Sequence, residues 1–268
     1  MINTQSSSRQ TIQKLIDIVG KNNVLTDEKD TRLYRQGRRY GTGNVLAVVV
    51  PGTLVEQWKV LEIAVDAGCI VIMQAANTGL TGGSTPFGDD YDRPVLLMST
   101  RRLRGIQVIN EGKQVICLPG ATLDRLEKEL AVFNREPHSV IGSSCIGASV
   151  LGGVCNNSGG ALVRRGPAYT ELALYARVND QGSLELVNHL GVNLGHSSEE
   201  ILSNLEQQKY QIADIENESQ CCASDHRYIK DVAKIDENTP ARFNADPSRL
   251  FEASGSAGKV CVFAVRLD

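Results

Sequence analysis

The sequence predicts an α+β protein of two α/β lobes, a small βαβ lobe followed by a larger lobe with a mixed or antiparallel sheet. Two short apolar runs, 45–50 and 69–73, flank an amphipathic helical stretch, which is typical of a βαβ unit. From about residue 105 the apolar runs are instead separated by short turns, which indicates antiparallel pairing. The last run, 260–267, is predicted to be a further strand.

Residues 1–40 are predicted to form a helical brace against the first lobe. Apolar residues recur at helical spacing and stop at Gly20, which is a helix end signal. These residues are Ile12, Leu15, Ile16 and Val19.

Residues 41–104 are predicted to form the first lobe. The run VLAVVV at 45–50 is short and rich in β-branched residues, so we expect a strand buried on both faces. A helix ending at Gly68 and a second buried strand at 69–73 follow, and strand, helix and strand together predict a parallel pair with a right-handed crossover. A third strand is expected at 95–98.

Residues 105–268 are predicted to form the second lobe. Runs 106–109 and 115–118 flank a short turn and predict a hairpin. A helix at 122–132, a second strand pair at 172–178 and 183–187, and a helix capped by Ser198 complete the expected elements.

Composition excludes several classes of protein. A net charge of −3 with interspersed signs gives no basic field for nucleic acid. The N-terminus lacks the apolar core of a secretory signal, and no stretch approaches the roughly 18 apolar residues of a membrane span, so we expect a cytoplasmic location or the cytoplasmic face of a membrane. The seven cysteines include no C-x-x-C pair, which argues against a zinc site or a disulfide framework.

Two glycine-rich segments are candidates for ligand binding. Segment 74–92, QAANTGLTGGSTPFGDDYD, follows a predicted strand and contains no Lys or Arg, so it is neither a Walker loop nor a Rossmann fingerprint. Its amides and hydroxyls predict a nest for a pyrophosphate, and a plain surface loop is the alternative. Segment 142–160, GSSCIGASVLGGVCNNSGG, predicts close approach to a flat or bulky group, with tight packing between chain segments as the alternative.

The stretches QAANTGLTGGSTP, REPHSVIGSSCIGASVLGGVCNNSGG and RRGPAYTELALYARVNDQG closely resemble the respiratory quinone-dependent D-lactate dehydrogenases. These belong to the flavoproteins typified by vanillyl-alcohol oxidase and p-cresol methylhydroxylase. Their N-A-G-G, Tyr-Gly and Asp-Gly features appear here, with departures, at 157–160, 168–169 and 179–182. The resemblance implies a p-cresol methylhydroxylase type FAD-binding fold with the cofactor between two lobes.

Position by position, the resemblance implies that eleven residues contact FAD, many through backbone atoms. They are Ala75, Ala76, Asn77, Thr78, Gly79, Gly83 and Ser84 in the first segment, with Gly142, Ser149, Gly159 and Cys261 in the second lobe.

The resemblance also implies oxidation of D-lactate to pyruvate with electrons passed through flavin to quinone, in a peripheral membrane enzyme of the respiratory chain. The family's substrate cap and membrane-associating region are expected to be absent from this chain, so we name no catalytic residue and expect no turnover by the chain alone. None of the four histidines lies in a cofactor loop, so noncovalent FAD is expected. The alternatives are a related 2-hydroxyacid dehydrogenase acting on D-2-hydroxyglutarate or glycolate, and a non-redox module that binds a nucleotide diphosphate.

Overall fold

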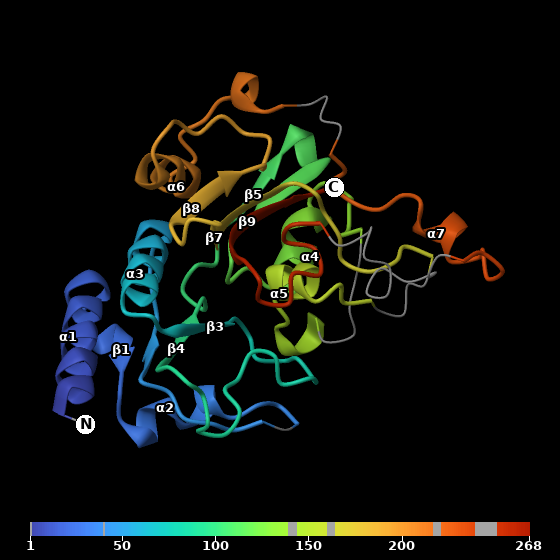
Figure 1. The fold of residues 1–268 in the computed structure, drawn as a ribbon. Coiled ribbons are helices and arrows are strands. Elements are labelled where there is room, and N and C mark those ends of the chain that lie inside the picture. Colours follow the sequence, from blue (N-terminus) through green and yellow to red (C-terminus); the bar gives the residue numbers. More distant parts are fainter. Residues whose placement is uncertain (1, 40, 139–143, 160–163, 217–220, 239–250) are drawn as a thin grey trace. The chain divides into compact units, whose positions relative to one another are not determined.

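The computed structural model describes residues 2–39, 41–138, 144–159, 164–216, 221–238 and 251–268 (Figure 1). The chain divides into two compact units, Met1–Leu103 and Arg104–Asp268. Each contains its own sheet.

The first unit has a four-stranded sheet in the order β1-β2-β4-β3. Strand β2 (Ala47–Val49) and strand β3 (Ile70–Gln74) both run parallel to β4 (Val95–Ser99), and β1 (Val24–Leu25) pairs antiparallel with β2. The sequence predicted that the strands at 45–50 and 69–73 pair with each other. This was wrong, because β4 lies between β2 and β3. Every residue of β4 is buried, whereas β3 is half-exposed except at Gln74, so the expectation that β3 is buried was also wrong.

Helices of the first unit cover this sheet. Helix α1 (Ile2–Val19) ends at Gly20, whose φ is 81°, and packs against α3 (Leu54–Asp66). Leu15 of α1 is completely buried. The capping hydroxyl of Thr53 accepts a hydrogen bond from the Glu56 amide and fixes the start of α3. A short helix, α2 (Glu28–Arg35), and a 3₁₀ turn, η1 (Lys21–Asn23), were not predicted.

The second unit has a five-stranded antiparallel sheet in the order β5-β6-β9-β7-β8. Its strands are β5 (Ile106–Ile109), β6 (Gln114–Cys117), β7 (Ala173–Val178), β8 (Leu184–Asn188) and β9 (Cys261–Leu267). The predicted hairpin is confirmed, with Ile109 opposite Gln114. The last strand of the sequence occupies the centre of the sheet, and six of its seven residues are buried.

Helices α4 (Leu123–Ala131) and α5 (Val150–Cys155) bury apolar side chains against this sheet. Reciprocal backbone hydrogen bonds, Leu123 to the Ala148 carbonyl and Val150 to the Ala121 carbonyl, join the starts of the two helices. The remaining helical elements are η2 (Asn110–Gly112), η3 (Ser144–Ile146), α6 (Ser198–Glu206), η4 (Ile212–Asp214) and α7 (Tyr228–Asp231).

Helix α6 starts one residue earlier than its predicted cap implied. Ser197, not Ser198, is the N-cap, because its hydroxyl accepts from the Glu200 amide while the Glu200 carboxylate accepts from the Ser197 amide. This reciprocal pair is a capping box.

In the described part of the chain, no helix combines the length and the apolar character needed to cross a bilayer.

Candidate functional site

The loop that follows β3 is anchored at both ends by one side chain. Gln74 is 3% exposed, and its amide nitrogen donates to the Tyr34 carbonyl at 2.9 Å and to the Ser84 carbonyl at 2.7 Å. Satisfying a buried amide in this way fixes the loop ends, because breaking either bond would leave a buried polar group without a partner.

Asn77 holds the middle of the same loop. Its φ of 52° is left-handed, a conformation that Asn adopts more readily than most residues. Its side-chain nitrogen donates to the Gln36 carbonyl at 2.9 Å, and its side-chain oxygen accepts from the Ser84 hydroxyl at 3.0 Å. A turn follows, in which the amide and hydroxyl of Thr85 both donate to the Gly82 carbonyl.

Two glycines of this loop leave space that the described residues do not fill. A Cβ placed on Gly79 would meet no described atom within 4 Å, and one on Gly83 would meet only the Thr81 hydroxyl, at 4.0 Å. Between Gln74 and Ser84 the left-handed positions are Asn77 and Gly82, and Gly79 does not have a positive φ. Of the other predicted contacts here, Ala75 and Thr78 are half-buried and Ala76 is exposed.

The segment that contacts Asn77 carries two arginines, although the loop itself has none. Gln36 is bridged to Thr42, and the Gly37 amide donates to the Gly41 carbonyl at 2.8 Å. Arg38 and Arg39 lie in the sequence between these paired positions, exposed and without an ion-pair partner among the described residues. The hydrogen bond from Asn77 to Gln36 therefore joins the middle of the loop to a segment whose cationic residues the loop sequence did not indicate.

The second candidate segment is only partly described, and Gly142 lies outside the described residues. Ser149 caps α5, and its hydroxyl accepts from the Gly152 amide at 3.1 Å. Gly159 is exposed, and a Cβ there would meet no atom of the described residues within 4 Å. Cys261 begins β9 and is 7% exposed.

The chain that leads into β9 lies beside the end of α5. The Gly255 amide donates to the Val154 carbonyl at 3.0 Å, and the Ala257 amide donates to the Cys155 carbonyl at 2.9 Å. These bonds place the stretch before Cys261 next to the stretch before Gly159. Residues far apart in the sequence therefore approach one another within the second unit.

Asn157, which sequence reasoning did not select, has an unsatisfied side chain in this region. It is 9% exposed with a φ of 44°, and no described residue hydrogen-bonds to its amide nitrogen or its amide oxygen. An unpaired buried amide costs free energy that a polar partner would recover. The sequence could have indicated Asn157 as a site residue, because it is the first residue of the N-A-G-G-like motif at 157–160.

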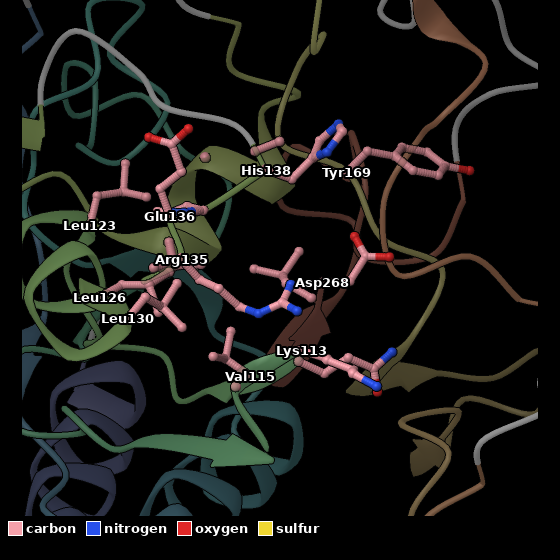
Figure 2. Close-up of a pocket in the computed structure, with 17 residues that line it drawn as sticks. Lys113, Val115, Leu123, Leu126, Leu130, Arg135, Glu136, His138, Tyr169 and Asp268 are labelled. Atoms are coloured by element: carbon pink, nitrogen blue, oxygen red, sulfur yellow. The ribbon is translucent and has the colours of Figure 1, made fainter. Parts of the chain in front are cut away.

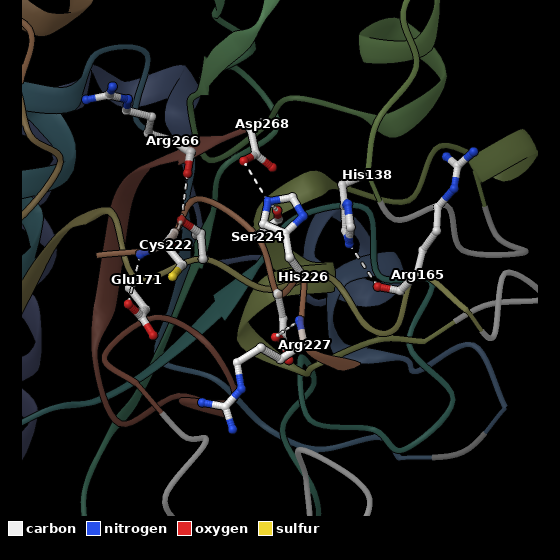
Figure 3. A network of polar contacts seen from close by, with 11 residues as sticks. His138, Arg165, Glu171, Cys222, Ser224, His226, Arg227, Arg266 and Asp268 are labelled. Carbon is white, nitrogen blue, oxygen red and sulfur yellow. Dashed lines mark hydrogen bonds and ion pairs between the residues drawn. The ribbon is translucent and has the colours of Figure 1, made fainter. Parts of the chain in front are cut away.

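The rings of three of the four histidines have hydrogen-bond partners among the described residues, and Figure 3 shows two of them, His138 and His226. His138 contacts the Arg165 carbonyl at 2.9 Å, and His189 contacts the Glu252 carboxylate. His226 contacts the Ser224 hydroxyl at 2.9 Å and the Asp268 carboxylate at 3.3 Å, both through Nε2. A catalytic triad would need the serine and the carboxylate on opposite ring nitrogens, so this arrangement does not form one.

The cysteines do not form a metal site. All seven are free thiols, and burial raises the pKa of the Cys155 thiol to about 11. Within the described ranges, no group of three or more His, Cys, Asp or Glu side chains could hold a metal ion.

A family model described as "FAD binding domain" matches residues 45–184. The chain belongs to this FAD-binding family. FAD is therefore its cofactor, as predicted, and the matched residues include both glycine-rich segments.

Two curated relatives are named quinone-dependent D-lactate dehydrogenase. The protein from Haemophilus influenzae is 60% identical over 264 residues, which is 98% of this chain and 46% of the relative. The protein from Escherichia coli is 55% identical over 265 residues, 99% of this chain and 46% of the relative. The chain thus spans about half the length of these relatives.

Solved structures confirm the predicted fold. p-Cresol methylhydroxylase with substrate bound aligns with a TM-score of 0.57 at 16% identity, covering 72% of this chain and 37% of that one. Alkyldihydroxyacetonephosphate synthase aligns with a TM-score of 0.56 at 14% identity over the same shares of the two chains. The FAD-binding chain therefore has the α+β fold of the p-cresol methylhydroxylase type.

The residues present fit a bound FAD. Gly79 and Gly159 leave backbone open where a side chain would fit, and Asn157 offers a donor and an acceptor that no described residue uses. Open glycine backbone and unpaired amides are features that a phosphate or a heterocycle can occupy.

Proposed function

We propose that this chain is the FAD-binding part of an enzyme that oxidises D-lactate to pyruvate and passes the electrons to a quinone. The observation that carries the proposal is the 60% identity, over 98% of this chain, to a quinone-dependent D-lactate dehydrogenase. A shared fold does not require such high identity, because p-cresol methylhydroxylase and alkyldihydroxyacetonephosphate synthase have this fold and are only 14–16% identical to this chain.

In this proposal the first glycine-rich loop holds the FAD pyrophosphate. Ala75, Ala76, Asn77, Thr78, Gly79, Gly83 and Ser84 would contribute backbone amides and hydroxyls. The bonds from Gln74 and Asn77 support this role because they fix the loop before a ligand binds, which reduces the entropy lost on binding.

The second unit would contribute the remaining contacts, through Gly142, Ser149, Gly159 and Cys261. We propose that FAD is held noncovalently. The support is that none of the four histidines lies in either glycine-rich segment, and that one ring nitrogen of each of His138, His189 and His226 already contacts another residue.

Bound FAD would accept the two electrons that are released, with two protons, when D-lactate becomes pyruvate, and quinone would take them up to become quinol. The contribution of this chain's residues is to bind and orient the cofactor. We assign no residue of the chain as the base that removes the hydroxyl proton.

Reconstitution tests the proposal. The purified chain would be mixed with FAD, passed through gel filtration and examined for a flavin absorption band. The longer protein would then be assayed with D-lactate, D-2-hydroxyglutarate and glycolate, using a soluble quinone as acceptor. We expect flavin retention and a preference for D-lactate. Preference for another acid would leave the FAD site intact and refute the substrate, whereas failure to retain flavin in both proteins would refute the FAD assignment.

We further propose that the longer protein acts at the cytoplasmic face of the cell membrane, where a lipid-soluble quinone is available. Membrane association would then involve regions outside this chain. Flotation of the longer protein and of this chain with vesicles would test this, with only the longer protein expected to float.

A further inference from the structure

The carboxyl ends of the parallel strands β2, β3 and β4 meet at one edge of the first sheet. Strand β4 lies between the other two, and its last residue, Ser99, is in register with Gln74 at the end of β3. The Thr100 amide then donates to the Gln74 carbonyl at 2.9 Å, so β3 and β4 leave the sheet side by side. In open α/β sheets, ligands bind at this edge. The loop proposed to hold the FAD pyrophosphate leaves β3 here.

Arg101, the second residue beyond β4, brings a positive charge to this edge. Its guanidinium carbon lies 5.3 Å from the centroid of the Tyr34 ring, which is a cation–π contact. The Tyr34 side chain packs against the apolar cluster around Leu97, and its carbonyl accepts from the Gln74 side chain, which also donates to the Ser84 carbonyl. The cation is thus held beside a residue that is joined to both ends of the loop.

Arg102, the next residue, is directed to a different strand. Its Nη1 donates to the Val50 carbonyl at 3.0 Å, just beyond β2, and its guanidinium occupies the space where a Cβ on Gly52 would lie. The loop at 74–92 contains three aspartates and no Lys or Arg, so its own side chains supply only negative charge. Of the two adjacent arginines, Arg101 is therefore the one placed beside the strand from which the loop starts.

A pocket of the second unit shows a different arrangement of charge. Figure 2 shows Lys113 and Arg135 in its lining together with the carboxylates of Glu136 and Asp268. The two positive charges are matched by two negative ones, so this pocket offers a phosphate no excess of positive charge.

We propose that Arg101 supplies positive charge that stabilises the FAD pyrophosphate in the loop after β3. Backbone amides and hydroxyls of the loop donate hydrogen bonds, and the guanidinium adds a full charge of the sign opposite to that of the phosphates. Because the Tyr34 ring positions this side chain before FAD binds, less side-chain entropy is lost on binding. The inference rests on the proposed place of the pyrophosphate and does not depend on D-lactate as the substrate.

Fluorescence titration of FAD into the purified chain at low and at high ionic strength tests the inference. Arg101→Gln should weaken FAD binding about fivefold at low ionic strength. Its affinity should approach that of the parent chain at high ionic strength, because salt screens an exposed charge. Arg101→Lys keeps the charge and should retain most of the affinity. Arg102→Gln is the matched control, and it should bind FAD like the parent chain at both ionic strengths.

Three results would overturn the inference: parental affinity of Arg101→Gln at low ionic strength, a loss that persists undiminished in high salt, or equal losses in the Arg101 and Arg102 variants. Gly79→Val separates this inference from the assignment of the loop. If Gly79→Val weakens FAD binding and Arg101→Gln does not, the loop holds the phosphates without Arg101. If neither variant loses affinity, the proposed place of the pyrophosphate is refuted as well.

Discussion

The Ser84 hydroxyl donates a hydrogen bond to the side-chain oxygen of Asn77 at 3.0 Å, across the loop proposed to hold the FAD pyrophosphate. Asn77 has a left-handed φ of 52°, so the bond stabilises a backbone conformation that few side chains favour. The same carboxamide donates to the Gln36 carbonyl, and one side chain therefore links three segments of the first unit.

Replacing Ser84 by Ala should loosen this loop. The hydrogen bond is worth about 1 kcal/mol, and its loss should weaken FAD binding about fivefold by leaving the loop less well ordered before binding. Ser84→Thr keeps the hydroxyl and should retain most of the affinity. Quenching of flavin fluorescence on titration measures both variants, and equal losses for Ala and Thr would show that the hydroxyl is not what matters.

Replacing Gly79 by Val should weaken FAD binding tenfold or more without destabilising the protein. The protein has room for a side chain there, since a Cβ would meet nothing within 4 Å. Any loss of affinity must then arise from contact with the cofactor. Gly79→Ala should show a smaller loss, and both variants should unfold thermally like the parent chain. Unchanged affinity in the Val variant would place the phosphates elsewhere.

Alkaline pH should destabilise the second unit through Cys117. This thiol is fully buried in β6, and burial raises its pKa above the ordinary value of 9.0, with the nearby Glu129 charge acting in the same direction. Below pH 9 the Cys117 thiol is protonated in both the folded and the unfolded chain, so its ionisation does not reduce the free energy of unfolding. Above pH 9 the thiol ionises in the unfolded chain first, and the free energy of unfolding falls as the pH rises.

Urea unfolding at a series of pH values from 8 upward, with the Cys117→Ala variant as control, would isolate this contribution. The variant should be less stable at pH 8 but should lose less stability on going to higher pH. Parallel curves for the two proteins would refute a role for this thiol.

Two adjacent serines should differ in their effect on helix α6. Ser197→Ala removes the cap and should cost about 1 kcal/mol of stability, whereas Ser198→Ala removes a half-buried hydroxyl in the first turn that does not cap the helix and should cost less. Chemical denaturation of both variants is the measurement. A larger loss of stability for Ser198→Ala than for Ser197→Ala would show that Ser198 is the cap, as the sequence alone predicted.

Most elements of the fold could be predicted because their signals are local. The turn at 110–113, the glycine after α1 and the helical stripe of α4 each act within a few residues. The order of strands in the first sheet could not be predicted this way. The length of the crossover between two parallel strands does not show whether a third strand lies between them. In the structure β4 occupies that place, where every one of its residues is buried.

Helix α2 was missed for a related reason. Its sequence, EKDTRLYR, has no apolar stripe, and Leu33 is 75% exposed, so hydrophobic periodicity gives no signal there. The capping serine of α6 was misplaced by one residue because Ser197 and Ser198 are both good caps, and only the position of Glu200 distinguishes them.

In the candidate site, too, local features could be predicted and long-range contacts could not. The family resemblance indicated which loop residues contact FAD, but the hydrogen bonds that hold the loop are to Gln36 and Tyr34, forty or so positions earlier in the chain. No local pattern links these residues to Asn77 or Gln74. The same long-range bond joins a loop without cations to the segment that carries Arg38 and Arg39.

The buried amide of Gln74 has a consequence for motion in the first unit. Because it bonds at once to the backbone of Tyr34 and of Ser84, neither segment can detach while the other stays in place without leaving that amide unsatisfied. The end of α2 and the far end of the loop should therefore open together, with amide hydrogens in both exchanging with deuterium at matched rates. Gln74→Leu should separate those rates, and the loop would then open more often than the helix.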